Sequence, residues 1–127
     1  IAIIEKQRIG NQDRSEALNL IGDVEGQTAL IVDDEIDTGG SVVAASDLLK
    51  RRGAAEVYCC AVHPIFSGTA RQRLQESVLK EVIVTDTLPV PEEKRFPSLQ
   101  ILSVAELLGE AIHRIHSGLS VGAMFDH

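Results

Sequence analysis

The amino-acid sequence predicts an α/β domain built on a parallel β-sheet with helices on both faces. Short apolar runs rich in β-branched residues alternate along the chain with longer segments of helical spacing, as in βαβ crossovers. The 127 residues fit one compact unit, so we expect a single domain over 1–127. Apolar residues make up 44% of the chain and aromatic residues only 3%, which indicates an aliphatic core.

Six segments are predicted as strands. The run at 28–32 is continuously apolar and rich in β-branched residues, so we expect it to be buried on both faces of the sheet. The other predicted strands lie at 2–4, 17–21, 56–62, 81–85 and 100–102. Residues 10–14 are polar and rich in chain-breaking residues, which predicts a mobile loop, and the three prolines of 88–97 predict another loop.

Three segments are predicted as helices. In 41–52 the apolar residues Val42, Ala45 and Leu49 recur at helical spacing, and a glycine follows the segment as a stop signal. A second helix is expected over 67–76. The longest helix is expected to begin at Ser103, where Ser103 and Glu106 match a capping box, and to end at a glycine, residue 118.

Charge and cysteine usage narrow the classes of function. The formal net charge is -7, and an acidic domain does not attract a polyanion, so we expect no nucleic-acid partner. No apolar run approaches membrane-spanning length, so we expect no membrane partner. Cys59 and Cys60 are neighbours on a predicted strand and point to opposite faces, so we predict two buried thiols rather than a disulfide, in a reducing cytoplasm. Because the chain begins at Ile1, we expect it to be part of a longer protein.

The segment that carries the most chemistry joins the 28–32 strand to the 41–52 helix. It reads Asp33-Asp34-Glu35-Ile36-Asp37-Thr38-Gly39-Gly40-Ser41. In parallel sheets, ligands bind beyond the carboxyl ends of the strands, where this segment is expected to lie together with 63–68 and 86–91. Two glycines before a helix allow close backbone approach, and the first turn of a helix presents N–H groups at a positive dipole end. We therefore predict a binding site for a phosphate monoester.

The carboxylates of this segment would repel a phosphate unless the two ends of the loop meet different parts of one ligand. Asp33 and Asp34 are suited to accept hydrogen bonds from sugar hydroxyls or to help hold a divalent metal. The stretch 37–41 is suited to wrap the phosphate with N–H and hydroxyl groups. A sugar phosphate has both ends. Asp and Gly are also common turn residues, and Ser41 could simply cap a helix, which is the alternative interpretation. The segment lacks the Gly-Lys-Ser/Thr of a Walker A motif.

The stretch 31–41 resembles the phosphoribosyl-diphosphate loop of the type I phosphoribosyltransferase fold. The flanking sequence narrows the resemblance to ribose-phosphate diphosphokinase, also called phosphoribosyl diphosphate synthetase. The flanking segments that carry it are 2–8, 63–68, 84–87, 107–116 and 120–125. Together they cover essentially the whole chain but only the second half of the family's usual protein. The resemblance therefore implies a C-terminal half whose N-terminal half is absent.

This resemblance implies a reaction. The diphosphoryl group of ATP passes to the anomeric hydroxyl of ribose 5-phosphate, giving 5-phosphoribosyl 1-diphosphate and AMP for nucleotide biosynthesis. It implies that most ATP contacts lie in the missing half and a neighbouring subunit, that Mg²⁺ is the cofactor, and that the full-length enzyme is a cytoplasmic homohexamer. The fragment alone is expected to be inactive. The residues implied to bind ribose 5-phosphate are Asp33, Asp34, Asp37, Thr38, Gly39, Gly40 and Ser41, with Asp33 and Asp34 also reaching the metal through the ligand.

The resemblance also implies roles outside the loop. Lys6 and Arg8 are implied to lie on a flexible loop and to stabilise the transferring diphosphoryl group, although taken alone they would be ordinary solvated charges. Glu5 and Gln7 stand where many members of the family carry Asp and Arg, which predicts modified rather than abolished chemistry. Ser120 is implied to belong to a regulatory site in the C-terminal tail.

Other polar and apolar residues are weaker candidates. A ligand contact at His63 and a pocket position for Asp86 compete with ordinary loop and turn roles, and we favour the turn role for Asp86. Two histidines three residues apart, His113 and His116, are predicted to lie on the surface of the last helix rather than to bind metal. Met124 and Phe125 suggest an interface.

Two other functions share parts of this pattern. A non-catalytic regulatory relative of the synthetase would be expected to lose the Thr-Gly-Gly stretch, which is intact at 38–40. A phosphoribosyltransferase that consumes the diphosphate would share the loop but not the flanking segments or the C-terminal helix.

Overall fold

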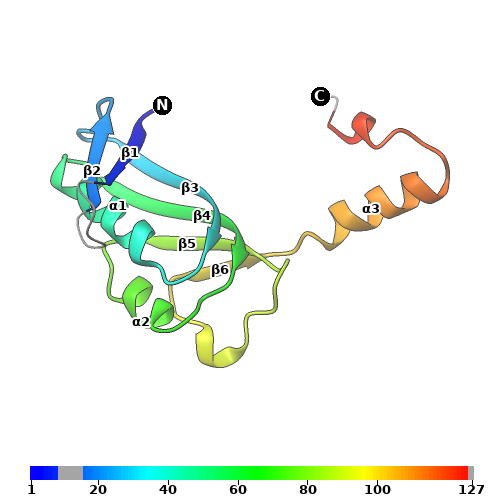
Figure 1. Ribbon diagram of the computed structural model, residues 1–127. Coiled ribbons are helices and arrows are strands. Elements are labelled where there is room, and N and C mark those ends of the chain that lie inside the picture. The colour runs from blue at the N-terminus through cyan, green and yellow to red at the C-terminus, as the bar shows by residue number, and fades with distance from the viewer. Residues whose placement is uncertain (9–15, 126–127) are drawn as a thin grey trace.

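The computed structural model describes residues 1–8 and 16–125, with side chains for 1–5 and 19–125. The loop predicted at 10–14 lies outside the described residues. The strands form two sheets (Figure 1). Strands β3 (Thr28–Ile36), β4 (Glu56–Pro64), β5 (Glu81–Thr85) and β6 (Leu99–Leu102) lie in that order in a four-stranded parallel sheet. Strands β1 (Ile3–Arg8) and β2 (Glu16–Ile21) form a separate antiparallel pair.

In the described residues, three α-helices connect or follow the parallel strands. Helix α1 (Gly40–Arg51) joins β3 to β4, α2 (Ala70–Gln75) joins β4 to β5, and α3 (Ala105–His116) follows β6. Short 3₁₀ turns occupy Glu92–Lys94 and Gly122–Met124. Every predicted strand and helix is present, and the α/β class with a parallel sheet is confirmed. The main differences in bounds are at β1 and β3, each of which continues four residues past its predicted end.

The core lies on one face of the parallel sheet. In-register residues of neighbouring strands, such as Cys59 and Val82, share that face and are buried against the helices. Helix α1 contacts both β3 and β4 and buries Val42, Ala45 and Leu49, as the helical spacing predicts. The side chains are mostly aliphatic, and the rings of Phe66 and Phe96 form a tilted pair with centroids 6.2 Å apart.

The opposite face of the sheet is exposed, so the expectation that β3 is buried on both faces is wrong. Leu30 and Val32 are 55% and 73% exposed. In the part of the chain that the structure describes, α1 and α2 lie together on one side, and α3 projects from the end of β6 away from the sheet (Figure 1). The predicted helices on both faces are therefore not found in these residues. An apolar run predicts that both faces of a strand are buried, but it does not identify the segments that cover them.

The two cysteines differ in burial. They point to opposite faces and remain free thiols, as predicted, but only Cys59 is fully buried, at 0% exposure. Cys60 is half-buried, because it lies on the exposed face of the sheet with Val32. Burial, with smaller contributions from Cys60 and Asp33, raises the pKa of the Cys59 thiol to about 12.

Helix α3 begins differently from the predicted capping box. Its N-cap is Val104, one residue after the expected cap Ser103, and the Val104 side chain makes no capping hydrogen bond. Asp86 instead accepts a hydrogen bond from the Val104 N–H at 2.8 Å, and Ser103 Oγ accepts from the Ala105 N–H at 3.2 Å. Asp86 therefore joins the end of β5 to the start of α3. No helix in the described residues has the length and apolar character required to cross a membrane.

Alkylation should distinguish the two thiols. At about pH 8 the thiolate population of Cys59 is small because its pKa is raised, and the side chain is buried, so we expect iodoacetamide to modify Cys60 and spare Cys59 in the folded chain. Mass spectrometry of labelled wild type and Cys60→Ser checks this. Rapid labelling of Cys59 without denaturant would show that the core face is not closed.

The start of α3 should loosen in acid. Hydrogen bonds from Ser103 and from the Val104 N–H lower the pKa of Asp86 below its ordinary 3.8. Because the folded pKa is lowered, the stabilising contribution is present above the unfolded pKa and is lost as pH falls through the folded value. We expect hydrogen-exchange protection of the Val104 amide to fall in that acidic range, after correction for intrinsic exchange. Asp86→Asn should remove this pH dependence, and an unchanged profile in the variant would contradict the assignment.

Candidate functional site

The segment singled out in the sequence forms the turn between β3 and α1. Strand β3 ends at Ile36 and α1 begins at Gly40, so the chain changes from strand to helix within three residues. A cavity of about 320 Å³ opens there. Six of the seven predicted binding residues line it, and Gly40 lies between two of them as the first residue of α1. The lining consists of Asp33, Asp34, Glu35, Ile36, Asp37, Thr38, Gly39, Ser41 and Val42.

Gly39 precedes α1 and Gly40 is its first residue, but only Gly39 is required by the geometry. Gly39 has φ of 74°, in the left-handed region that L side chains rarely adopt. A Cβ at Gly39 would also lie 3.3 Å from Leu74 Cγ, tighter than ordinary packing. A Cβ at Gly40 would lie 3.7 Å from Arg73 Nη1, which is an ordinary contact. The turn therefore depends on Gly39 for its backbone, while Gly40 keeps the approach to the first helical turn open.

The amides of the turn face away from the protein's own acceptors. Among the residues that the structure describes, none accepts a hydrogen bond from the backbone N–H of Thr38, Gly39 or Gly40. These donors lie at the N-terminus of the 12-residue helix α1, where the dipole is positive. Backbone donors and a helix N-terminus in one cavity form the arrangement that binds a phosphate or another small anion.

The carboxylates at the end of β3 are partly engaged by their own backbone. Asp33 Oδ1 accepts from the Asp34 N–H at 3.0 Å, and Asp34 Oδ1 accepts from the Glu35 N–H at 2.9 Å. One oxygen of each side chain is held in place, and both residues are exposed. Carboxylates fixed in this way are suited to accept hydrogen bonds from hydroxyl groups of a ligand. The cavity thus has an acidic end on β3 and an amide-rich end on α1.

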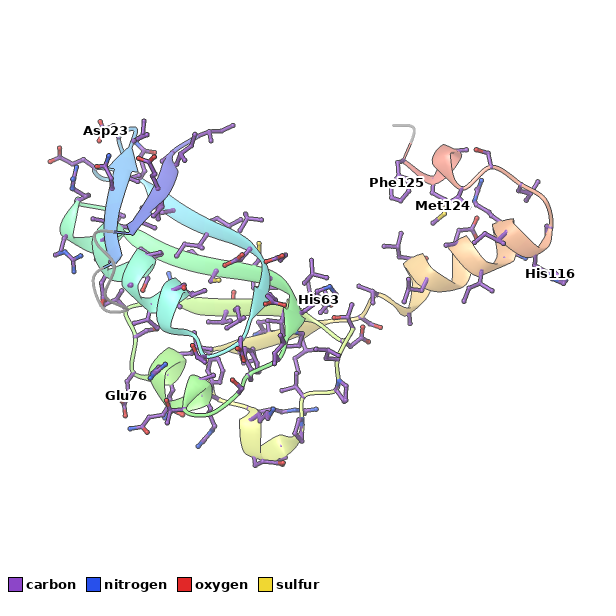
Figure 2. All side chains as sticks on the ribbon, in the orientation of Figure 1. Asp23, His63, Glu76, His116, Met124 and Phe125 are labelled. Atoms are coloured by element: carbon purple, nitrogen blue, oxygen red, sulfur yellow. The ribbon has the colours of Figure 1, made fainter. Side chains whose placement is uncertain are left out.

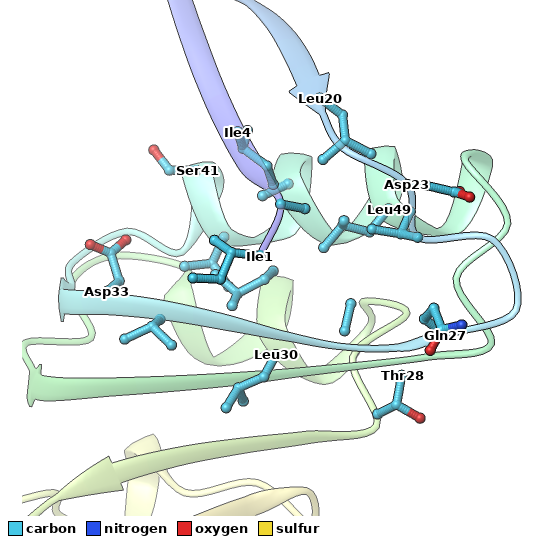
Figure 3. Close-up of a pocket in the computed structure, with 17 residues that line it drawn as sticks. Ile1, Ile4, Leu20, Asp23, Gln27, Thr28, Leu30, Asp33, Ser41 and Leu49 are labelled. Atoms are coloured by element: carbon cyan, nitrogen blue, oxygen red, sulfur yellow. The ribbon is translucent and has the colours of Figure 1, made fainter.

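A second, larger cavity adjoins the first. It measures about 710 Å³ and lies between the β1–β2 pair, β3 and α1 (Figure 3). Asp33 near the end of β3 and Ser41 at the start of α1 line both cavities, and apolar residues such as Ile4 and Leu20 line the rest. No sequence pattern indicates this cavity, because its walls come from several separate segments of the chain.

Three predicted functional residues lie outside the turn. The backbone of Lys6 and Arg8 belongs to β1, paired with Leu18 and Glu16, so the expectation that they lie on a flexible loop is wrong; their side chains are not among those described. Ser120 follows α3, and its carbonyl accepts from Arg114 Nη1 at 3.0 Å. That tail lies far from the β3–α1 turn (Figure 1).

The histidines and the C-terminal tail are arranged as surface features. His63 is exposed at the end of β4, where Nδ1 lies 3.0 Å from Thr87 Oγ1 (Figure 2). His116 is exposed at the far end of α3 (Figure 2). In the tail that follows, Met124 is half-buried and Phe125 is exposed. The role of Met124 and Phe125 as an interface stays a prediction.

The described residues offer few metal ligands. They contain no group of three or more His, Cys, Asp or Glu side chains placed to hold a metal ion. Asp33 and Asp34 could supply at most two carboxylates to an ion at the cavity. Two carboxylates fit Mg²⁺ that takes its remaining ligands from water and a phosphorylated substrate, and they do not fit a site made by protein alone.

Comparison with known proteins identifies the family. A family model described as "Phosphoribosyl synthetase-associated domain" matches residues 6–126. A ribose-phosphate pyrophosphokinase of Nostoc sp. is 53% identical over 125 residues, covering 98% of this chain and 38% of that protein. The protein of the same name from Synechococcus elongatus is 55% identical over 126 residues, with coverage of 98% and 38%.

A solved structure agrees with the family model and with these relatives. Phosphoribosylpyrophosphate synthetase from Mycobacterium smegmatis matches with a TM-score of 0.83 and 43% identity, over 92% of this chain and 37% of that one. The chain thus spans less than two fifths of the length of these relatives. With nearly all of its residues matched by the family model, the chain belongs to the phosphoribosyl synthetase-associated domain family.

Proposed function

We propose that this chain is the ribose 5-phosphate-binding part, the C-terminal half, of a ribose-phosphate pyrophosphokinase. The observation that carries the proposal is one cavity with fixed carboxylates at the end of β3 and, at residues 38–40, amide donors that no described residue accepts from. A sugar phosphate has complementary groups at its two ends. The names of the relatives support the same reaction, transfer of a diphosphoryl group from ATP to the anomeric hydroxyl of ribose 5-phosphate.

The phosphate end of the substrate binds at the turn. The amides of Thr38, Gly39 and Gly40 and the hydroxyl of Thr38 surround it, and the dipole of α1 adds a positive potential. Because the chain is acidic overall, with a net charge of -7, these local dipoles rather than long-range attraction must hold the anion. Donors fixed in a folded turn need little reorganisation when the charge arrives.

The ribose end binds at the carboxylates. Asp33 and Asp34 each keep one oxygen free of the local backbone hydrogen bonds, and these oxygens accept from the ribose hydroxyls. Mg²⁺ would contact the same two residues through the ligand and would supply charge neutralisation for the diphosphoryl group. The protein's own contribution is to orient the sugar so that its anomeric hydroxyl is held in one position.

The proposal also assigns roles to residues outside this cavity. Lys6 and Arg8, at the end of β1, stabilise the diphosphoryl group as it transfers, and ATP binds mostly through parts of the protein that this chain lacks. Ser120 takes part in a regulatory site, and the complete enzyme is a cytoplasmic homohexamer. A non-catalytic regulatory relative is the alternative, and the intact 38–40 stretch argues against it.

Calorimetric titration of the chain with ribose 5-phosphate in the presence of Mg²⁺ tests the proposal. Asp33→Ala should lower the affinity about tenfold, because hydrogen bonds to a charged acceptor are lost. The loss should be smaller with 2-deoxyribose 5-phosphate, which has one hydroxyl fewer. Asp47→Ala is the matched control, since it removes the same charge from α1 outside both cavities. Absence of binding by the wild type, or equal losses in the two variants, would refute the proposal.

The two adjacent glycines provide a second test. Gly39→Ala should destabilise the chain by roughly 1–2 kcal/mol from its left-handed backbone alone, and the contact with Leu74 adds to this cost. Gly40→Ala should cost much less, because its Cβ meets only ordinary contacts. Urea unfolding of both variants gives the free energies. Equal costs at the two positions would show that the turn does not depend on the left-handed residue.

A further inference from the structure

One segment distant in sequence donates hydrogen bonds to the carbonyls of the β3–α1 turn. We call residues 66–73, the end of the β4–α2 loop and the first part of α2, the brace segment. The Phe66 N–H donates to the Ile36 carbonyl at 3.0 Å, and the Ser67 N–H donates to the Asp37 carbonyl at 3.0 Å. Arg73 Nη1 donates to the Thr38 carbonyl at 3.2 Å. Three successive carbonyls of the turn are thus occupied by a single segment.

These bonds fix the direction of the amides on the other side. In a planar trans peptide, the carbonyl of one residue and the N–H of the next point in opposite directions. Holding the Asp37 carbonyl therefore aims the Thr38 N–H away from the brace segment, and holding the Thr38 carbonyl does the same for the Gly39 N–H. These are two of the three amides that no described residue accepts. The brace segment thus determines where the free donors point.

The brace segment also holds the one carboxylate within the turn. Ser67 Oγ donates a hydrogen bond to Asp37 Oδ1, in addition to the backbone bond between the same two residues. Asp37 is the acidic residue nearest to the free amides in sequence, so its charge would oppose an incoming phosphate. A hydroxyl that holds this carboxylate on the brace side lowers that opposition.

The anchor of the brace segment is strained and buried. Phe66 has φ of 48°, the one positive φ among the described non-glycine residues, and is 2% exposed. Its ring packs against Phe96, and Lys94 Nζ donates to the carbonyl of the preceding Ile65 at 3.0 Å. Unfavourable backbone conformations of this kind persist only where the surroundings over-determine them, and they gather at functional sites. The buried ring fixes the turn that presents Ser67.

We propose that Arg73 and Ser67 are positioning residues for the anion-binding turn, acting through Thr38 and Asp37. This inference rests on the proposed function, because it assigns the turn a phosphorylated ligand. Arg73 acts by orienting a peptide and by placing its guanidinium beside Gly40 at the rim of the turn. Ser67 acts by fixing the direction of a carboxylate.

Helix α2 offers a matched control for Arg73. Arg71 is on the same helix, is exposed and has the same charge, but its Nε donates to the Arg95 carbonyl at 2.8 Å, away from the turn. Arg73→Ala and Arg71→Ala therefore change the net charge equally. Arg73→Lys keeps a charged donor at the position, and Ser67→Thr keeps the hydroxyl that Ser67→Ala removes.

The first measurement needs no ligand. From ¹⁵N relaxation, the order parameter of the Gly39 amide should fall from about 0.85 to below about 0.6 in Arg73→Ala, and should stay unchanged in Arg71→Ala. Ser67→Ala keeps the backbone bond from the Ser67 N–H to the Asp37 carbonyl, so it should leave the Thr38 amide rigid and act only on ligand affinity, which Ser67→Thr should preserve. If the Gly39 amide stays rigid in Arg73→Ala, the inference is overturned whatever the turn binds.

The second measurement is titration with ribose 5-phosphate, followed by the same amide resonances. Arg73→Ala should weaken binding about tenfold, as expected for a lost charged hydrogen bond, and Arg73→Lys should recover most of it. Arg71→Ala should change the affinity less than twofold. If Arg71→Ala weakened binding equally, the loss of affinity would be explained by the change in net charge, and the inference would be overturned. If the wild type does not bind ribose 5-phosphate but the Gly39 amide loosens in Arg73→Ala, the positioning role stands and the proposed function fails.

Discussion

The change from strand to helix within residues 37–39 is the constraint on which the site depends. A left-handed residue must stand at the last position of the turn for α1 to fold back onto β3 and β4, and Gly39 meets that demand beside the buried Leu74. The same reversal brings the last carboxylates of the strand and the first amides of the helix to one cavity. Opposite electrostatic preferences lie a few residues apart because the backbone turns there.

The fold could largely be predicted from sequence, because its elements depend on local patterns. Helical spacing in α1 predicts which of its residues face the core, and the structure buries Val42, Ala45 and Leu49 accordingly. The predictions that failed concern burial and capping, which depend on contacts with other segments of the chain. Exposure of Val32 and the half-burial of Cys60 follow from the absence of a covering layer in the described residues, and Asp86 replaces the expected cap of α3 through a contact 18 residues away.

The candidate site likewise has a part that could be predicted from sequence and a part that could not. The residues from Asp33 to Ser41 are contiguous, so a single run of sequence was sufficient to predict which of them share a cavity. Ser67 and Arg73 carried no such signal, because a serine and an arginine before and within a short helix are ordinary until the turn is seen beside them. Lys6 and Arg8 show the converse: their assignment came from resemblance, and the strand in which their backbone lies could not be derived from their charge.

The projecting helix α3 gives the chain two levels of cooperativity. All of its residues are exposed or half-buried, and it has only 12 residues, a length at which an isolated helix is marginal in water. Its melting therefore exposes little new apolar surface and does not require the parallel sheet to open. On heating, the helical signal of α3 is free to decay over a broad range of temperature, while the sheet with α1 and α2 unfolds in a sharper step of its own.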